Sequence, residues 1–442
     1  MTEFIAKKEK MRGSVNKKAI LILIVLLEFL SNRLAYGLDD YGGHLYLFQF
    51  VRNIGPSGFY GSDPKAMGMG NIHCSVLEDA SAICWNPAGA VLLDGINATL
   101  VYKYTRNGAI KVRNDYEEIA DSDYRFNHHH MVDGFMTLST SPVTIGLSYS
   151  PVFTIPIDAK LLMAPQASQK GHLNCDAFTL TLARWLRKNI AIGINLSYIH
   201  TDGRLEIDYE EQEQTDELGN VIGRFCLKHR NSLSGNGFGY DLSLYFRPNR
   251  KLSLGLVAKR YGKVHWDESH SLSLIGYQSG SESIPDEFQG KADGYFIISN
   301  RYGAGGSFNL FKSLWFAGEV VYIKGSEARC VIEKEKTVFI DSSQADIYHD
   351  QRISYNWKDR TELHFGTKFN INEHVPLRFG FFSLPDYKES PFSTDAQYFF
   401  TLGTGFHKDL YQLDISYADS RILSPSDNSG YSLILSTSIK IR

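Results

Sequence analysis

Apolar residues alternate with small or polar residues along most of the chain from Ile96 onward. The clearest run covers residues 190–198, where every second side chain from Ile190 to Tyr198 is large and apolar and the side chains between them are small or polar. Successive side chains of a β-strand point to opposite faces, so this period of two predicts strands with one apolar face. No segment of comparable length in this part of the chain has the period of a helix.

Fourteen runs of this kind can be traced, most of them about ten residues long, which is the length that a tilted strand needs to cross a bilayer. Short turns such as 187–188, 248–249 and 408–409 alternate with longer polar loops such as 203–234 and 325–357. This alternation, and an even strand number that leaves no open edge in lipid, are typical of a transmembrane antiparallel β-barrel. We therefore predict an all-β barrel of about 14 strands over residues 96–442. The runs are 96–106, 131–141, 143–152, 174–186, 189–206, 236–247, 250–266, 299–310, 313–325, 359–370, 375–384, 396–407, 410–420 and 430–442.

The same pattern predicts a polar barrel lining. Lys368 and Arg378 flank one predicted periplasmic turn, so they are candidate contacts for a ligand carboxylate through charge-assisted hydrogen bonds. The alternative is that they pair with carboxylates on neighbouring strands. The predicted inward positions are Asp241, Glu319, Glu362, His364, Lys368, Arg378, His407, Asp414 and Lys440.

The first 37 residues predict a cleaved signal peptide. Lys17 and Lys18 precede an apolar run from Ala19 to Leu27, and the small residues Ala35 and Gly37 follow it. The run is shorter than the roughly 20 residues of a membrane-spanning helix. We therefore expect export and a location in the outer membrane of a Gram-negative-type cell; whether translation starts at residue 1 or 11 stays open.

Aromatic residues are abundant, with 25 Tyr and 27 Phe in 442 residues, and 38 Gly accompany them. This composition favours many short strands. In a membrane barrel, amphipathic rings gather where the wall meets the lipid headgroups. We expect interfacial girdles formed by aromatic residues near the predicted strand ends, namely Tyr104, Trp185, Trp266, Trp315 and Tyr417.

Charge and motif content argue against several other classes. The net charge of −3 and the pI near 6.5 provide no basic field for nucleic acid. The sequence has no HExxH, no nucleophile elbow and no convincing Ser/His/Asp order, so we predict no enzyme, no metal and no cofactor. The cysteines match no zinc spacing, and their disulfide pairing stays open. They are Cys74, Cys84, Cys175, Cys226 and Cys330.

Residues 38–95 do not alternate and are rich in Gly, Ala and Asp. They contain KAMGMG at 65–70 and EDASAICWNPAG at 78–89. These motifs strongly resemble the N-terminal signature of the FadL/TodX family of outer-membrane hydrophobe transporters, and equally that of PorV-type and uncharacterised relatives. In that family the segment forms a plug, or hatch, inside the barrel, so the resemblance implies a plug over 38–95 and a hatch motif at Asn86, Pro87, Ala88 and Gly89. Physically, Asn86 suits a helix cap, Pro87 suits a first helical position, and the small residues permit close packing.

The resemblance implies a passive channel for long-chain fatty acids or other hydrophobic molecules, with hydrophobic small molecules and outer-membrane lipid as partners. Sideways release into lipid would keep an apolar ligand out of water. The candidate gate is the third predicted strand, because Pro142 precedes it and Pro151 and Pro156 lie at or beyond its outer end, each removing one ladder donor. The family is understood to use the same strand.

Other interpretations stay open at this point. The prolines could merely end the strand where a loop begins. The chain could be a non-transporting scaffold or secretion accessory like the PorV relatives, or a surface adhesin. The sequence names neither the ligand, nor a protein partner, nor the oligomeric state.

Overall fold

The computed structural model describes residues 63–106, 109–112, 122–125, 129–140, 142–161, 164–215, 221–278, 281–282, 286–339, 344–347, 351–354, 357–385, 396–424 and 430–441. All of them belong to the unit formed by Phe50–Arg442. The predicted signal peptide and residues 38–62 of the predicted plug lie outside the described residues. None of the helices in the described part is long and apolar enough to cross a membrane.

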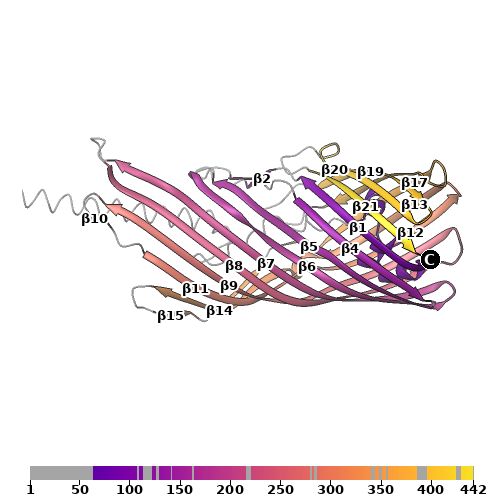
Figure 1. The fold of residues 1–442 in the computed structure, drawn as a ribbon, viewed down its shortest axis with the longest axis horizontal. Coiled ribbons are helices and arrows are strands. Elements are labelled where there is room, and N and C mark those ends of the chain that lie inside the picture. The colour runs from indigo at the N-terminus through magenta and orange to yellow at the C-terminus, as the bar shows by residue number, and fades with distance from the viewer. Residues whose placement is uncertain are drawn as a thin grey trace, which may run out of the picture. The chain divides into compact units, whose positions relative to one another are not determined.

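The described strands form an antiparallel sheet that closes on itself as a 14-strand barrel (Figure 1). Closure is made by β1 and β21, which pair from Ile96↔Ile441 to Arg106↔Tyr431. The predicted fold class is therefore confirmed. The positions filled by one strand each are β1 (Gly95–Arg106), β4 (His129–Thr140), β5 (Val143–Leu161), β6 (Ala164–Arg187), β7 (Ile190–Thr215), β8 (Val221–Phe246), β9 (Leu252–Gln278), β18 (Pro376–Leu384), β19 (Gln397–Lys408), β20 (Tyr411–Asp419) and β21 (Tyr431–Ile441).

Three positions of the barrel are built from consecutive shorter elements. β11 (Asp286–Ile297) and β12 (Asn300–Phe311) follow one another along β9, and β13 (Leu314–Lys324) and β14 (Arg329–Phe339), separated by η4 (Gly325–Glu327), follow one another along them. The next position holds β15 (Gln344–Ile347), β16 (Gln351–Ser354) and β17 (Arg360–Asn370). β10 (Ser281–Glu282) extends the sheet beside β9, and β2 (Ala109–Val112) pairs with β3 (Ser122–Arg125) separately.

The strands agree with the predicted runs at the short-turn end but extend much further at the other end. The predicted loop 203–234 is wrong for most of its length, because β7 continues to Thr215 and β8 begins at Val221. The predicted loop 325–357 is likewise occupied in part by β14. Beyond the apolar band the outward face becomes polar while the inward face stays buried: Leu205 and Ile207 of β7 are buried, and Arg204 and Asp208 are exposed.

Burial separates the two faces of the wall as predicted. On β8, Leu242 is 50% exposed and Asp241 is 2% exposed. All the predicted inward positions are buried or half-buried, including His407 and Lys440, which are half-buried. The apolar face thus points outward along the barrel.

The predicted girdle is wrong for all three tryptophans, which lie on the inward face. Trp266 is buried, the Trp185 indole donates a hydrogen bond to the Val91 carbonyl at 3.3 Å, and the Lys368 ammonium lies 4.4 Å from the centre of the Trp315 ring. The indole N–H and ring face thus serve interior contacts. The aromatic side chains found on the outward face near its polar boundary include Tyr149, Phe178, Tyr198, Phe238 and Tyr240.

Residues 63–93, called the internal segment below, pack inside the barrel. They form α3 (Pro64–Gly68), η2 (Ala80–Cys84) and η3 (Pro87–Leu92). Their apolar side chains share one buried core with inward-facing residues from several strands around the wall. The core comprises Met67, Ala80, Ile83, Ala88, Ala90 and Val91 of the internal segment and Val101, Phe135, Ala183, Ala191, Tyr245, Phe382, Phe399, Ala418 and Ile434 of the wall.

Short polar side chains begin two of the three helices. The Asp63 carboxylate accepts from the Lys65 N–H at 2.8 Å, and the Asp79 carboxylate accepts from the Ser81 N–H at 2.9 Å. The expected side-chain cap at Asn86 is wrong, because its amide instead donates to the Cys74 carbonyl at 2.7 Å. That bond ties two parts of the internal segment together.

Candidate functional site

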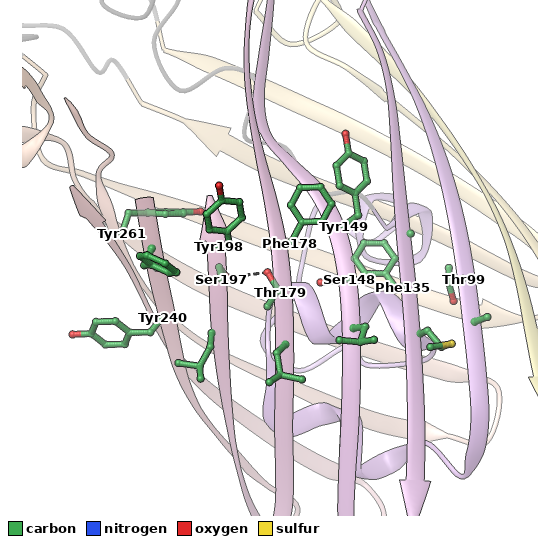
Figure 2. Close-up of a pocket in the computed structure, with 18 of the residues that line it drawn as sticks. Thr99, Phe135, Ser148, Tyr149, Phe178, Thr179, Ser197, Tyr198, Tyr240 and Tyr261 are labelled. Atoms are coloured by element: carbon green, nitrogen blue, oxygen red, sulfur yellow. Dashed lines mark hydrogen bonds between the residues drawn. The ribbon is translucent and has the colours of Figure 1, made fainter. Parts of the chain in front are cut away.

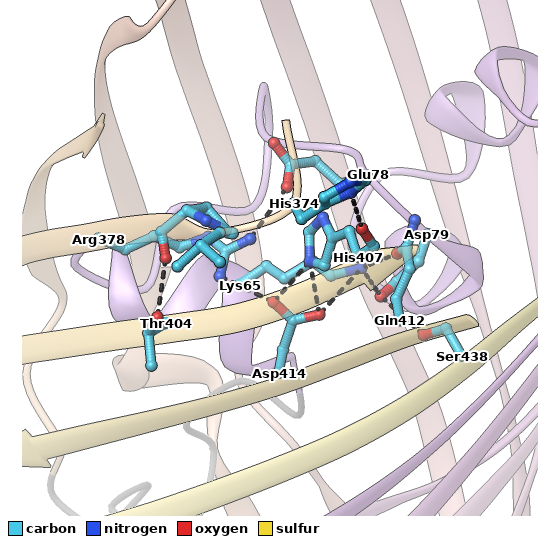
Figure 3. Close-up of polar contacts among 12 residues, drawn as sticks. Lys65, Glu78, Asp79, His374, Arg378, Thr404, His407, Gln412, Asp414 and Ser438 are labelled. Carbon is cyan, nitrogen blue, oxygen red and sulfur yellow. Dashed lines mark hydrogen bonds and ion pairs between the residues drawn. The ribbon is translucent and has the colours of Figure 1, made fainter. Parts of the chain in front are cut away.

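A buried charged cluster joins the internal segment to strands β17, β18 and β20 (Figure 3). Lys368 lies directly opposite Arg378 on the neighbouring strand. The Lys368 ammonium pairs with one oxygen of Glu78, and Arg378 Nη2 lies 3.3 Å from the other. Arg378 Nη1 also donates to Asp414 Oδ1 at 2.8 Å. The Glu78 carboxylate of the internal segment is therefore held between two cations of the wall.

Lys65 occupies the centre of the same cluster. Its ammonium lies 2.5 Å from Asp79 Oδ2 and 3.6 Å from Asp414 Oδ2, and it donates to Gln412 Oε1 at 2.7 Å. Its side chain is fully buried. The cluster thus sets three cations (Lys65, Lys368 and Arg378) against three carboxylates (Glu78, Asp79 and Asp414), and His407 Nε2 also lies 2.9 Å from Asp414 Oδ1.

Two of the three charged residues of the internal segment in this cluster, Lys65 and Glu78, are kept ionised by their partners. Burial raises the pKa of Glu78, but Lys368 and Arg378 more than offset this and hold it well below its usual range. Burial lowers the pKa of Lys65, but Asp79 and Asp414 raise it overall above its usual value. Both groups are therefore charged at neutral pH.

The structure brings the predicted pair Lys368 and Arg378 together, and the carboxylate between them belongs to Glu78. A ligand carboxylate could bind here only by displacing Glu78, so headgroup binding stays a prediction. Sequence reasoning did not assign Lys65, Glu78 or Asp79 to this cluster. The signal was present, because all three belong to the two N-terminal motifs.

The opposite side of the internal segment is held through its backbone. The Ala88 N–H donates to Ser243 Oγ at 2.8 Å, and the Asn195 amide donates to the Ile83 carbonyl at 2.8 Å. A Cβ at Gly193 of β7 would overlap the backbone of Pro87 and Ala88. Three of the four hatch-motif residues, Asn86 to Ala88, are therefore in close contact with the wall or tied to the loop at Cys74.

A small polar cavity of about 40 Å³ lies between the internal segment and the wall. It is lined by His73 and Trp85 of the internal segment and by charged wall residues that include Lys259, Glu319 and Glu362. This volume admits a few water molecules at most, whereas ligand pockets usually measure about 300–1,000 Å³. A hydrophobic ligand cannot be housed in this space.

The backbone pairing between strands β4 and β5 ends at Tyr149. Their ladder runs from Thr140↔Val143 to Gly134↔Tyr149, and within the described residues no ladder pair joins them beyond that point. Yet β4 begins earlier, at His129, and β5 continues to Leu161. The pairing of the barrel wall is therefore incomplete at this place.

Two of the three candidate gate prolines, Pro151 and Pro156, lie on β5 beyond the last ladder pair, whereas Pro142 lies at the opposite end of the ladder. Pro142 forms the turn before β5, Pro151 stands at a bulge between Pro151 and Phe153, and Pro156 pairs with His172 of β6. A side-chain bond crosses the break, because Ser150 Oγ donates to Asp133 Oδ1 at 2.5 Å. The internal segment reaches the same place, with Cys84 Sγ 3.9 Å from Ser150 Oγ.

Apolar side chains face inward next to the break. Phe153 of β5 lies 6.4 Å, between ring centres, from Phe296 of β11, and Ile155, Leu173 and Ile199 are buried on the same face of their strands. These apolar side chains lie beside buried polar ones, because Lys103, Asp133 and Ser150 also face inward at the break. Within the described residues, Cys74, Cys84 and Cys175 are free thiols.

These features define a class: a closed fourteen-stranded barrel with an apolar outer wall, an N-terminal segment packed inside it, and an interrupted ladder after the second strand. No protein-family model matches the sequence, and no curated protein is similar to it in sequence.

Several solved structures share this β-barrel fold. The P. putida toluene transporter TodX aligns at 14% identity and a TM-score of 0.62, covering 87% of this chain and 99% of that one. The Ralstonia pickettii toluene transporter TbuX aligns at 13% identity and a TM-score of 0.61, covering 87% and 100%. A Pseudomonas aeruginosa FadL homologue aligns at 12% identity and a TM-score of 0.56, again covering 87% and 100%. At these identities the likeness establishes the fold.

Proposed function

We propose that this protein is a passive outer-membrane channel for hydrophobic small molecules, which leave it sideways into the lipid between β4 and β5. The observation that carries the proposal is the end of the β4–β5 ladder at Gly134↔Tyr149, beside the buried apolar side chains of Phe153 and Ile155. The solved structures with this fold include two toluene transporters and a FadL homologue, which supports an apolar cargo. A signal peptide over residues 1–37 would deliver the chain to that membrane.

The physical case for sideways release rests on where the polar groups lie. The route straight through the barrel is occupied by the internal segment with its charged cluster, and the cavity beside it measures about 40 Å³. Moving an apolar molecule past these charges would take it from an apolar environment into a polar one. At the break, the apolar side chains of Phe153 and Ile155 adjoin a wall that lacks ladder bonds to β4.

The test locks the break with a disulfide. Asp133 and Ser150 are replaced by cysteine, since Asp133 Oδ1 and Ser150 Oγ lie 2.5 Å apart, and Cys84 is replaced by alanine because its sulfur is 3.9 Å from Ser150 Oγ. Oxidation should abolish the uptake of radiolabelled toluene and oleate into cells, and dithiothreitol should restore it. Binding of oleate to the purified protein in detergent should persist in both states.

The matched control places a disulfide in the intact part of the same ladder, at Ser139 and Thr144, whose hydroxyl oxygens lie 2.9 Å apart. Oxidation there should leave uptake unchanged. Unchanged uptake after locking Asp133 to Ser150 would mean that the cargo leaves by another route. If the unmodified protein carries neither probe, the channel proposal fails and a non-transporting scaffold becomes the better explanation.

A further inference from the structure

A groove of about 1330 Å³ crosses the outward face of the wall from β1 to β9 (Figure 2). Its two edges are rows of outward-facing side chains. Its floor is the strand backbone between these rows, at inward-facing residues such as Ser148, Thr179 and Ser197. Because the walls are outward-facing residues, the groove opens to the membrane and not to the lumen.

The upper edge is aromatic and follows the cross-strand register. Tyr149 lies opposite Phe178, Phe178 opposite Tyr198, and Tyr198 pairs with Phe238, with neighbouring rings 5.2 and 5.7 Å apart at the first and last of these pairs. The next outward residue above Phe238 is the polar Asn236. The aromatic row therefore marks the outer boundary of the apolar band.

The lower edge is aliphatic along most of its length and ends in a cation. Each member lies directly opposite the next across neighbouring strands. Five strand spacings of about 4.8 Å give this edge a length of roughly 24 Å. Its members are Met136, Leu147, Leu180, Leu196, Tyr240 and Arg260.

Arg260 differs from two other exposed arginines, Arg204 and Arg421, each of which pairs with a carboxylate. Arg204 lies 2.6 Å from Glu206, and Arg421 lies 2.6 Å from Asp419. Arg260 instead lies opposite Tyr240 and donates to the Tyr302 hydroxyl at 3.3 Å, and among the described residues no carboxylate forms an ion pair with it. A guanidinium at the edge of an apolar band, held by two phenols, is suited to a phosphate.

We propose that the groove binds an acyl chain of an acidic membrane lipid whose phosphate headgroup is held by Arg260. The chemistry of the groove selects its occupant, because an apolar groove that ends at an unpaired cation matches an amphiphile. This face of the barrel is also in contact with membrane lipid. Water is excluded from the groove by the chain, and the charge of the phosphate is met by Arg260. The groove adjoins the end of the β4–β5 ladder, since Gly134 and Tyr149 line it, but lipid binding requires only that the barrel lies in a membrane.

The test compares lipid retention on the whole purified protein by native mass spectrometry. Equal amounts of dioleoylphosphatidylglycerol and dioleoylphosphatidylcholine are added in detergent. The unmodified protein should retain the acidic lipid at least about tenfold more than the zwitterionic one, and Arg260→Gln should reduce this ratio about tenfold, because it removes a charge-assisted contact. Arg260→Lys should keep most of the preference, since lysine also binds phosphate as a point charge.

Two further variants make the result specific. Arg204→Gln removes an exposed outward arginine that already has a carboxylate partner, so the lipid ratio should not change. Leu180→Trp fills the middle of the groove and should lower the retention of both lipids severalfold without altering their ratio. A preference that survives Arg260→Gln would overturn the headgroup assignment, and full retention in Leu180→Trp would overturn the acyl-chain assignment. Unchanged heat-modifiable electrophoretic mobility verifies that each variant is folded.

Discussion

The internal segment is attached to the barrel in two different ways on its two sides. Towards β17–β20 it is held by charged side chains, with Glu78 between Lys368 and Arg378. Towards β7 and β8 it is held through its backbone, with the Ala88 N–H on Ser243 and the chain pressed against Gly193. The first attachment depends on the side chains of the internal segment. The second depends mainly on wall residues, because Ser243 and Gly193 contact the backbone of the segment.

The difference indicates which side can be released. A backbone contact against glycine offers no partner that a ligand could replace, whereas a carboxylate held by two cations can be exchanged for another carboxylate. Burial makes the charged side costly to disrupt by mutation, because a cation or anion that loses its partner remains away from water. The two sides should therefore respond differently to substitution, which the following variants measure.

The largest effect is expected from Arg378→Leu. Its guanidinium is fully buried and contacts Asp414 at 2.8 Å and Glu78 at 3.3 Å, so its loss leaves two carboxylates poorly compensated. We expect the free energy of urea unfolding to fall by about 3–5 kcal/mol. Arg204→Leu is the control, since the side chains of Arg204 and its partner Glu206 are 62% and 31% exposed and the pair should contribute no more than about 1 kcal/mol. Equal losses in both variants would show that burial does not distinguish these ion pairs.

The backbone side is tested by Gly193→Val. A Cβ here would overlap the main chain of Pro87 and Ala88, so the internal segment must shift. We expect a loss of about 1–3 kcal/mol and faster protease cleavage within residues 63–93. Gly134→Val is the matched control, because a Cβ at Gly134 meets nothing within 4 Å. Similar cleavage of the two variants would argue that the close contact at Gly193 does not hold the segment.

The sequence was informative where lipid imposes a pattern. The runs 190–198 and 236–247 were found because each side chain must choose between lipid and lumen, and the apolar choice repeats every second residue. The continuation of β7 beyond residue 203 is not predicted, because its outward face there carries polar residues such as Arg204 and Asp208 in place of the apolar face of a lipid-exposed strand. The orientation of Trp266 was missed for a related reason, since an indole is compatible with either the interface or the interior.

The charged cluster could be predicted only in part. Lys368 and Arg378 were placed together because they flank one short turn, so the register fixes their separation. Their partner Glu78 lies about three hundred residues away in a segment that does not alternate, and no register relates the two. The same holds for Lys65 and Asp414. Contacts of the internal segment depend on its path through the barrel, which periodicity does not encode.

A smaller effect is expected from Glu78→Gln. The variant leaves Arg378 paired with Asp414 and leaves Lys368 above the Trp315 ring, so both cations keep a partner. We expect the free energy of urea unfolding to fall by about 1–2 kcal/mol, less than for Arg378→Leu. Thermal and urea unfolding of the two variants side by side provides the measurement. A loss as large as that of Arg378→Leu would show that Glu78, and not Asp414, is the main partner of the arginine.

The smallest effect is expected from acidification in the physiological range. The pKa of Glu78 is held well below its usual range by Lys368 and Arg378, although burial acts in the opposite direction. A carboxyl group whose folded pKa is depressed contributes its full stabilisation above its unfolded pKa of about 4.3, and loses it only as the pH falls through the folded value. The difference in urea midpoint between the unmodified protein and Glu78→Gln should therefore stay constant between about pH 8 and pH 5. Below about pH 4 the unmodified protein should lose stability faster than Glu78→Gln, so that the two converge in acid. A difference between the two proteins that already narrows from pH 7 to pH 5 would mean that Glu78 titrates near its ordinary pKa and that the two cations do not hold it.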